Sequence, residues 1–155
     1  MWWYEHYYEA VKVCDKAEFW TIYENGTAFE NHRKGDYPKK IHEVGYYRMN
    51  GLGTEEKVHH GGNSGYVAIN LAYLMGASKI VLIGYDHKHT YGKRHWFGDH
   101  DSKKFKTNAE DTDRWLRNFK VLSDDLRHEG VDLVNCSIET AIDSCRRGKL
   151  EEELK

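Results

Sequence analysis

The sequence predicts an α/β fold of Rossmann-like type, a single domain in which a small parallel sheet is flanked by helices. Two buried strands predict it, the continuous apolar runs at 79–84 and 131–134, whose Val, Ile and Leu content is typical of strands covered on both faces. Each run follows a helical pattern, at 65–75 and at about 108–129. Helices that alternate with strands indicate a parallel sheet.

The first part of the chain is rich in aromatic residues. Residues 3–17 have a helical apolar face, and the alternating residues 18–23 predict a strand that ends at the Asn25-Gly26 turn. Residues 26–57 read as irregular, except for a short strand at 44–49. We therefore separate an aromatic-rich N-terminal part, 1–58, from the region with the motifs, 59–155.

Local signals bound the helices of the second part. Asn63 or Ser64 should cap the helix at 65–75, which is apolar almost all round and so should be buried, and Gly76 should end it. Thr107 or Asn108 should begin the long amphipathic helix that Gly130 ends. A short helix is expected from 138 to about 146, and residues 150–155 should form a frayed last turn.

The charge balance and the cysteine content restrict the partners and the cellular compartment that we expect for this protein. The 23 Lys and Arg residues against 25 Asp and Glu give a net charge of -2, so electrostatics indicates neither nucleic acid nor membrane as a partner. No signal peptide or transmembrane run is evident. Three cysteines without metal or redox spacing favour reduced thiols in a cytoplasm. The apolar helix at 2–13 favours self-association into a homo-oligomer.

Polar residues gather where the two predicted strands end. Asp86 and His87 follow the first strand, Asn135 and Ser137 follow the second, and the Gly-rich turn at 61–65 precedes its helix nearby. Ligands of open α/β sheets bind outside the carboxyl ends of the strands. We expect these three clusters to converge on one cleft.

The Gly-rich turn has two readings. Gly62, Asn63, Ser64 and Gly65 could hold a phosphate through free backbone N–H groups and the helix dipole. They could equally form an ordinary tight turn with a capping side chain. The turn is neither a P-loop nor a G-x-G-x-x-G fingerprint.

The loop after the first strand is crowded with titratable and aromatic groups. Asp86 could orient a ribose, a sugar hydroxyl or a metal, or it could simply cap the loop. His100 could be a general base oriented by Asp99, and a divalent metal could instead be held by histidines and acids whose spacing matches no standard motif. Trp96 could stack on a base or sugar, or seal the loop. The candidate substrate contacts are Tyr85, His87, His95 and Trp96.

A resemblance adds to these readings. The run GGNSGYVAINLAYLMGASKIVLIGYD, followed by HWFGDH, resembles phage and prophage proteins related to the domain-of-unknown-function-115 proteins and, more distantly, to bacterial sialyltransferases of glycosyltransferase family 42. The closing segment VDLVNCSIETAIDSCRRGKLEEEL is similar to theirs. The resemblance covers residues 59–155.

The resemblance implies site roles. Ser64-Gly65 would contact the nucleotide of a CMP-sugar donor, Asp86 would be the acid after the next strand, and the turn at 135–140 would close the nucleotide side. His100, in Gly98-Asp99-His100, would be the general base that deprotonates an acceptor hydroxyl. The implied protein is a phage-encoded glycosyltransferase-like enzyme of the bacterial cytoplasm that binds a nucleotide or nucleotide-sugar and uses no metal.

The resemblance breaks down at the N-terminus. The relatives begin with an apolar strand and a Gly-rich turn, whereas this chain begins at Met1-Trp2-Trp3, so we expect a fragment, a form completed by a partner, or a protein without the donor site. One alternative function is a metal-dependent phosphotransferase or hydrolase. It would use Asp86, His87, His95 and Asp99. Another is a non-catalytic module for nucleotide binding or assembly.

Overall fold

The computed structural model describes residues 18–24, 41–54, 57–89 and 109–155. The predicted helix at 3–17 and the loop that contains His95, Trp96, Asp99 and His100 lie outside these residues. The chain divides into two compact units, Met1–Gly45 and Tyr46–Lys155. The second unit contains the described candidate site residues.

The first sheet has the strand order β1-β2-β3, and the division between the units falls within β2. β1 (Phe19–Glu24) confirms the strand predicted at 18–23, and β2 (Ile41–Tyr47) starts three residues before the one predicted at 44–49. β3 (Lys57–His59) was not predicted. Three residues with one buried side chain, Val58, are too short to show an alternating pattern.

The second sheet is parallel and confirms the α/β class. Its strands are β4 (Lys79–Leu82), β5 (Asp132–Asn135) and β6 (Arg146–Arg147), in the order β4-β5-β6. Lys79 pairs with Asp132 and Leu82 with Asn135, so β4 and β5 start and end level with each other. Both predicted strands are present, and β4 ends two residues earlier than expected.

The helix predicted over 138–146 is wrong. Residues 138–145 form bends and irregular backbone, and residue 146, the end of the predicted helix, belongs to β6. The cause is local competition for backbone hydrogen bonds, since the Thr140 hydroxyl accepts from the Ile142 N–H at 3.0 Å and the Asn135 side chain accepts from the Ser137 N–H at 2.9 Å.

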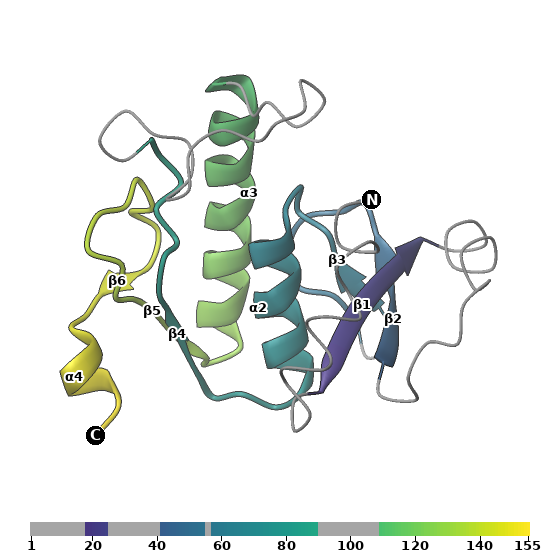
Figure 1. Ribbon diagram of the computed structural model, residues 1–155, viewed down its shortest axis with the longest axis horizontal. Coiled ribbons are helices and arrows are strands. Elements are labelled where there is room, and N and C mark those ends of the chain that lie inside the picture. Colours follow the sequence, from purple (N-terminus) through teal and green to yellow (C-terminus); the bar gives the residue numbers. More distant parts are fainter. Residues whose placement is uncertain (1–17, 25–40, 55–56, 90–108) are drawn as a thin grey trace, which may run out of the picture. The chain divides into compact units, whose positions relative to one another are not determined.

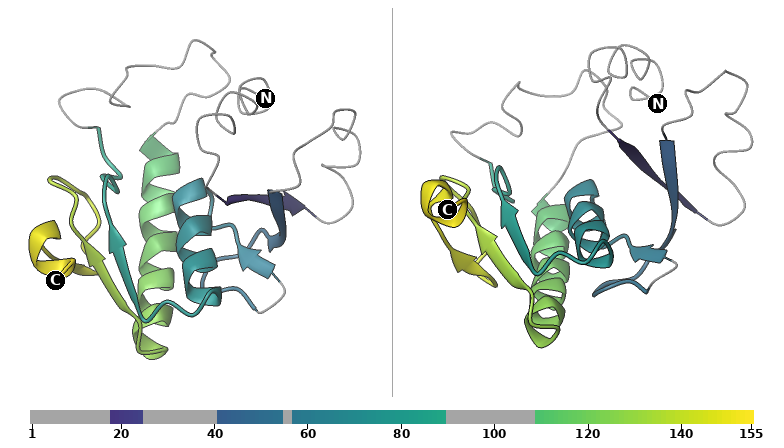
Figure 2. Two further views of the ribbon diagram at one scale, coloured as in Figure 1. Left: turned by 60° about the horizontal axis from the view of Figure 1, so that its bottom comes forward. Right: turned by 90° about the horizontal axis from the view of Figure 1, so that it is seen from below.

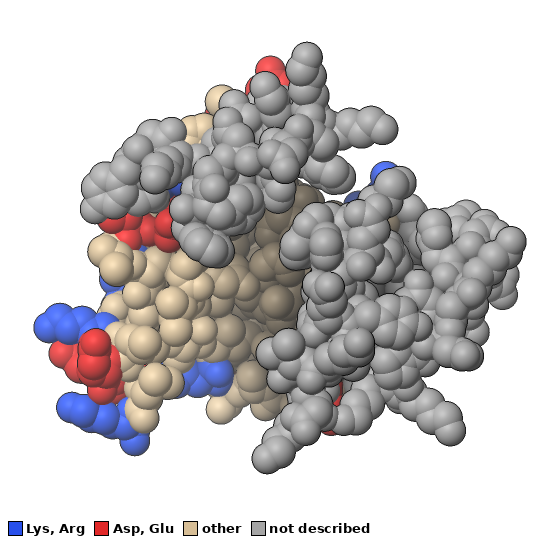
Figure 3. Space-filling view, viewed as in Figure 1, with Lys and Arg blue, Asp and Glu red and all other residues tan. Residues whose placement is uncertain are grey.

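The C-terminal helix α4 (Leu150–Glu153) is anchored by ion pairs rather than left as a loose end. Glu153 pairs with Lys79 of β4 at 2.6 Å and with Arg146 of β6 at 2.5 Å. These two cations hold the pKa of the Glu153 carboxyl at about 2. Figure 3 shows acidic and basic side chains close together at this end of the molecule.

Helices α2 (Ser64–Leu74) and α3 (Ala109–His128) end in the same way. After α2, the Gly76 N–H donates to Tyr73 O at 2.8 Å and the Ala77 N–H to Ala72 O at 3.1 Å. After α3, Gly130 and Val131 make the matching pair of bonds at 3.1 and 2.9 Å. Both glycines have positive φ, which is the Schellman arrangement, and they confirm the predicted stops.

The core of the second unit lies between these helices and the parallel sheet. Figures 1 and 2 show α2 and α3 side by side on one face of β4 and β5. α2 is less buried than predicted, because Ala68 is exposed. The buried core residues are Tyr66, Ile69, Ile80, Leu82, Phe119, Leu122, Leu126, Leu133 and Ile142.

Polar side chains of α2 and α3 fix the segment before the Gly-rich turn. The Asn70 side chain accepts from the Gly53 N–H at 2.6 Å, and Asp125 accepts from the Leu52 N–H at 3.0 Å. The Tyr66 hydroxyl accepts from the Gly51 N–H, and burial raises its pKa to about 12. The chain therefore reaches residue 60 in a fixed position.

Candidate functional site

The Gly-rich turn before α2 is pressed against α3. The Gly62 N–H donates to His60 Nδ1 at 3.1 Å, and Asn118 of α3 donates to Gly61 O at 2.8 Å. Gly62 has φ of 103°. A Cβ there would lie 2.8 Å from the Trp115 indole, so only glycine fits between the turn and α3.

The first turn of α2 has backbone N–H groups without a partner inside the helix. Asn63 is the N-cap, as one of the two predictions had it, and its Oδ1 accepts from the Tyr66 N–H at 3.0 Å. The first amides of a helix have no partner inside it. Those of Ser64 and Gly65 precede the amide that Asn63 caps, and the Ser64 side chain is exposed.

Three buried polar atoms in the described part of the chain have no hydrogen-bond partner. They are Asn63 Nδ2, His87 Nδ1 and Trp115 Nε1. The indole nitrogen lies 2.8 Å from the position of a Gly62 Cβ, and the His87 and Trp115 rings are 6.4 Å apart. Buried polar groups in folded proteins are almost always paired, so three unpaired atoms around one turn distinguish this place from the rest of the described chain.

His87 stands out in its backbone and in its surroundings. With φ of 48° it is the one non-glycine residue with positive φ among the described residues. Its ring stacks on Tyr85 at 6.5 Å and meets the edge of Phe119 at 5.6 Å. Burial lowers the pKa of His87, against the opposing effect of the Asp86 carboxylate, so the imidazole is neutral at neutral pH.

Tyr85 connects the end of β4 to the first turn of α2. Its hydroxyl donates to Gly65 O at 3.1 Å, and its backbone N–H donates to the Ser137 hydroxyl at 2.8 Å. Burial raises the pKa of the phenol, which therefore stays protonated. Tyr85 thus borders the orphaned atoms on one side and the loop after β5 on the other.

Asn135 and Ser137, predicted to bind the nucleotide, are bonded within the chain. Asn135 is fully buried, and its Nδ2 donates to Tyr85 O at 3.3 Å and to Thr140 Oγ1 at 3.2 Å. Thr140 also donates to Tyr85 O at 2.6 Å. We call Tyr85, Asn135, Ser137 and Thr140 the strand-end lock, because they join the loops after β4 and β5.

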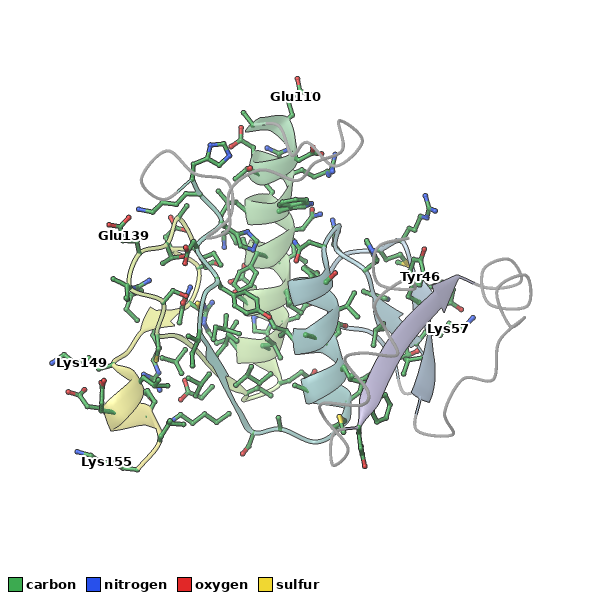
Figure 4. All side chains as sticks on the ribbon, in the orientation of Figure 1. Tyr46, Lys57, Glu110, Glu139, Lys149 and Lys155 are labelled. Atoms are coloured by element: carbon green, nitrogen blue, oxygen red, sulfur yellow. The ribbon has the colours of Figure 1, made fainter. Side chains whose placement is uncertain are left out.

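A second contact joins the same two loops at the surface. Lys88 pairs with Glu139 at 2.8 Å, and Figure 4 shows Glu139 on the segment after β5. The half-buried Asp86 lies next to His87 and uses its carbonyl to accept from the Ala141 N–H at 2.7 Å.

The structure therefore brings together part of the predicted site. Gly62 to Gly65, Tyr85 and His87 meet around Trp115, and Asn135 and Ser137 lie beyond Tyr85. The catalytic candidates Asp99 and His100, with His95 and Trp96, are outside the described residues. Trp115 is not among the candidate site residues predicted from the sequence. The available signal was the indole N–H, which needs a partner when it is buried.

The arrangement offers donors rather than metal ligands. Within the described ranges, no group of three or more His, Cys, Asp or Glu side chains could hold a metal ion. No helix in those ranges is long and apolar enough to cross a membrane. Comparisons of this chain with protein-family models, curated proteins and solved structures found no match.

Proposed function

We propose that the chain binds the phosphate of a nucleotide or nucleotide-sugar at the amino-terminal end of α2. The observation that carries this proposal is the set of three buried, unpartnered polar atoms around the turn at 61–65, Asn63 Nδ2, His87 Nδ1 and Trp115 Nε1. An oxyanion would give all of them a partner.

The donor chemistry supports a phosphate in particular. The backbone N–H groups of Ser64 and Gly65 lie at the positive end of the helix dipole, where phosphate groups bind in many proteins. Asn63 Nδ2 and Trp115 Nε1 add two side-chain donors. Tetrahedral oxyanions accept several hydrogen bonds at once, as this number of donors requires.

We propose sugar transfer as the reaction, in line with the resemblance of residues 59–155 to glycosyltransferase-like proteins. His100 would take the proton of an acceptor hydroxyl, whose oxygen forms a bond to the anomeric carbon as the bond from that carbon to the phosphate oxygen breaks. The nucleotide leaves with its negative charge held by the donors at 63–65. Asp99 or Asp86 would orient His100.

Asn63→Asp is the sharpest test of the binding step. Asp is as good an N-cap as Asn, so α2 should keep its start, but the Nδ2 donor becomes a carboxylate oxygen that repels phosphate. We expect nucleotide affinity to fall at least about tenfold. The measurement is calorimetric titration with CMP, CDP, UDP, GDP, ADP and CMP-sialic acid.

Ser78→Asp is the matched control, because it adds the same charge at an exposed position just beyond the other end of α2. It should leave affinity unchanged. Equal loss of affinity in both variants, or no nucleotide binding by the original chain, would overturn the proposed site.

The reaction is tested with His100→Ala. Nucleotide binding that this variant keeps, together with loss of sugar transfer, would support the proposed reaction. Binding without any transfer would identify a non-catalytic module, and turnover that requires Mg²⁺ or Mn²⁺ would favour a phosphotransferase.

A further inference from the structure

We propose that His87 contacts the bound oxyanion directly and takes up a proton as that oxyanion binds. This inference rests on the proposed function, because it concerns the same site at the amino-terminal end of α2. It adds a specific ionisable contact and a pH dependence of binding.

The backbone and the ring of His87 are held in an unusual position. A non-glycine residue at φ of 48° is strained and persists only where the surroundings enforce it. Here the surroundings are the stack on Tyr85 and the edges of Trp115 and Phe119. Strain of this kind gathers at ligand sites, and it holds Nδ1 buried without a partner.

The groups around His87 allow a bound ligand to change the protonation state of its imidazole. Asp86 is adjacent and favours the imidazolium, whereas Tyr85 is a protonated phenol and α3 contributes uncharged rings. In the first turns of α3, before Trp115, Asp111 and Arg114 pair with each other at 2.6 Å, and Lys88 pairs with Glu139. In the Gly-rich turn, His60 is engaged by the Gly62 N–H.

An oxyanion at α2 changes this balance. Its negative charge favours the imidazolium and so raises the pKa of His87 on binding. The proton comes from solvent and is shared between Nδ1 and the ligand oxygen as a charge-assisted hydrogen bond. Affinity is therefore highest below the pKa of free His87. It falls as the pH rises through the pKa of the bound state.

Inorganic sulfate is the best probe, since it carries no proton between pH 5 and 8. We expect sulfate affinity to rise as the pH is lowered from 8 to 5, by at most about tenfold for a pKa displacement of one unit. Calorimetry in buffers of different ionisation enthalpy should detect proton uptake on sulfate binding. His87→Asn, which tolerates the left-handed backbone, should abolish both effects. His89→Asn, at an exposed position two residues on, should keep them.

The outcomes separate this inference from the proposed function. Binding of sulfate or CMP without proton uptake, or with the same uptake in His87→Asn, would overturn the role of His87 and leave the binding site standing. Failure of both sulfate and the nucleotide panel to bind would overturn the two together. Loss of uptake in His89→Asn alone would move the contact to His89 and so contradict the inference.

Discussion

The strand-end lock and the start of α2 are both rich in polar atoms, but they differ in how those atoms are used. In the lock, Asn135 donates twice and accepts once within the chain, although it is completely buried. At the start of α2, Asn63 uses its oxygen for the cap and leaves its nitrogen without a partner. The side-chain nitrogen of an asparagine is therefore bonded within the chain at the first place and without a partner at the second.

Asn135→Ala should produce the largest effect, and that effect should be on stability. The substitution leaves the buried Ser137 N–H without its partner and removes one of the hydrogen bonds of the Tyr85 carbonyl and of the Thr140 hydroxyl, which keep their bond to each other. We expect a cost of about 3 kcal/mol in the free energy of unfolding. Urea denaturation measures it, with the exposed Asn50→Ala as control. A stable variant with weakened nucleotide binding would place Asn135 in the ligand site instead.

Gly62→Ala should destabilise the start of α2 by about 2 kcal/mol, from backbone strain at positive φ and from contact with the indole. Gly84→Ala is the matched control, because its φ is also positive, at 75°, and nothing lies within 4 Å of a Cβ there. The difference between the two unfolding free energies isolates the contact with Trp115. Equal costs would mean that the turn does not press on α3, and tryptophan fluorescence provides a second measure.

Trp115→Phe should have the smallest effect on stability and a clear effect on binding. It removes a buried N–H that lacks a partner, so the ligand-free protein should gain up to about 1 kcal/mol, while nucleotide affinity falls about tenfold. Tyr73→Phe removes an exposed hydroxyl that bonds Glu129 and should change neither quantity. A destabilised Trp115→Phe variant with unchanged affinity would show that the indole serves packing alone.

The features that could be predicted are those determined by residues close to each other in the sequence. The β-branched runs at β4 and β5, the caps at Asn63 and the stops at Gly76 and Gly130 follow from local chemistry, and the structure confirms them. β6 could not be predicted, because Arg146-Arg147 is a strand only through its pairing with Val134 and Asn135. The helix predicted at 138–146 does not form, because the side chains of Asn135 and Thr140 accept from the backbone N–H groups of Ser137 and Ile142.

The candidate site also has one part that local sequence predicts and another that depends on packing. The Gly-rich turn and the residues after β4 were identifiable by type and order. The use of Asn135 inside the lock, and of Trp115 beside Gly62, depends on which element packs against which. Periodicity assigns Trp115 to an apolar face, but it does not report whether the indole nitrogen has a partner. That information exists only in three dimensions.

The paired glycine stops after α2 and α3 have a consequence for how the chain tolerates change in length. Each stop leads within three residues into a strand, and Asp132 N–H bonds to Ser78 O where the two connections meet. One added residue before β4 would shift its register against β5 and turn Ile80 and Leu82 away from the core, and one added before β5 would do the same to Leu133. Insertions there should abolish folding. The length of these two short connections therefore determines the position of the far ends of both strands and of the candidate site beside them.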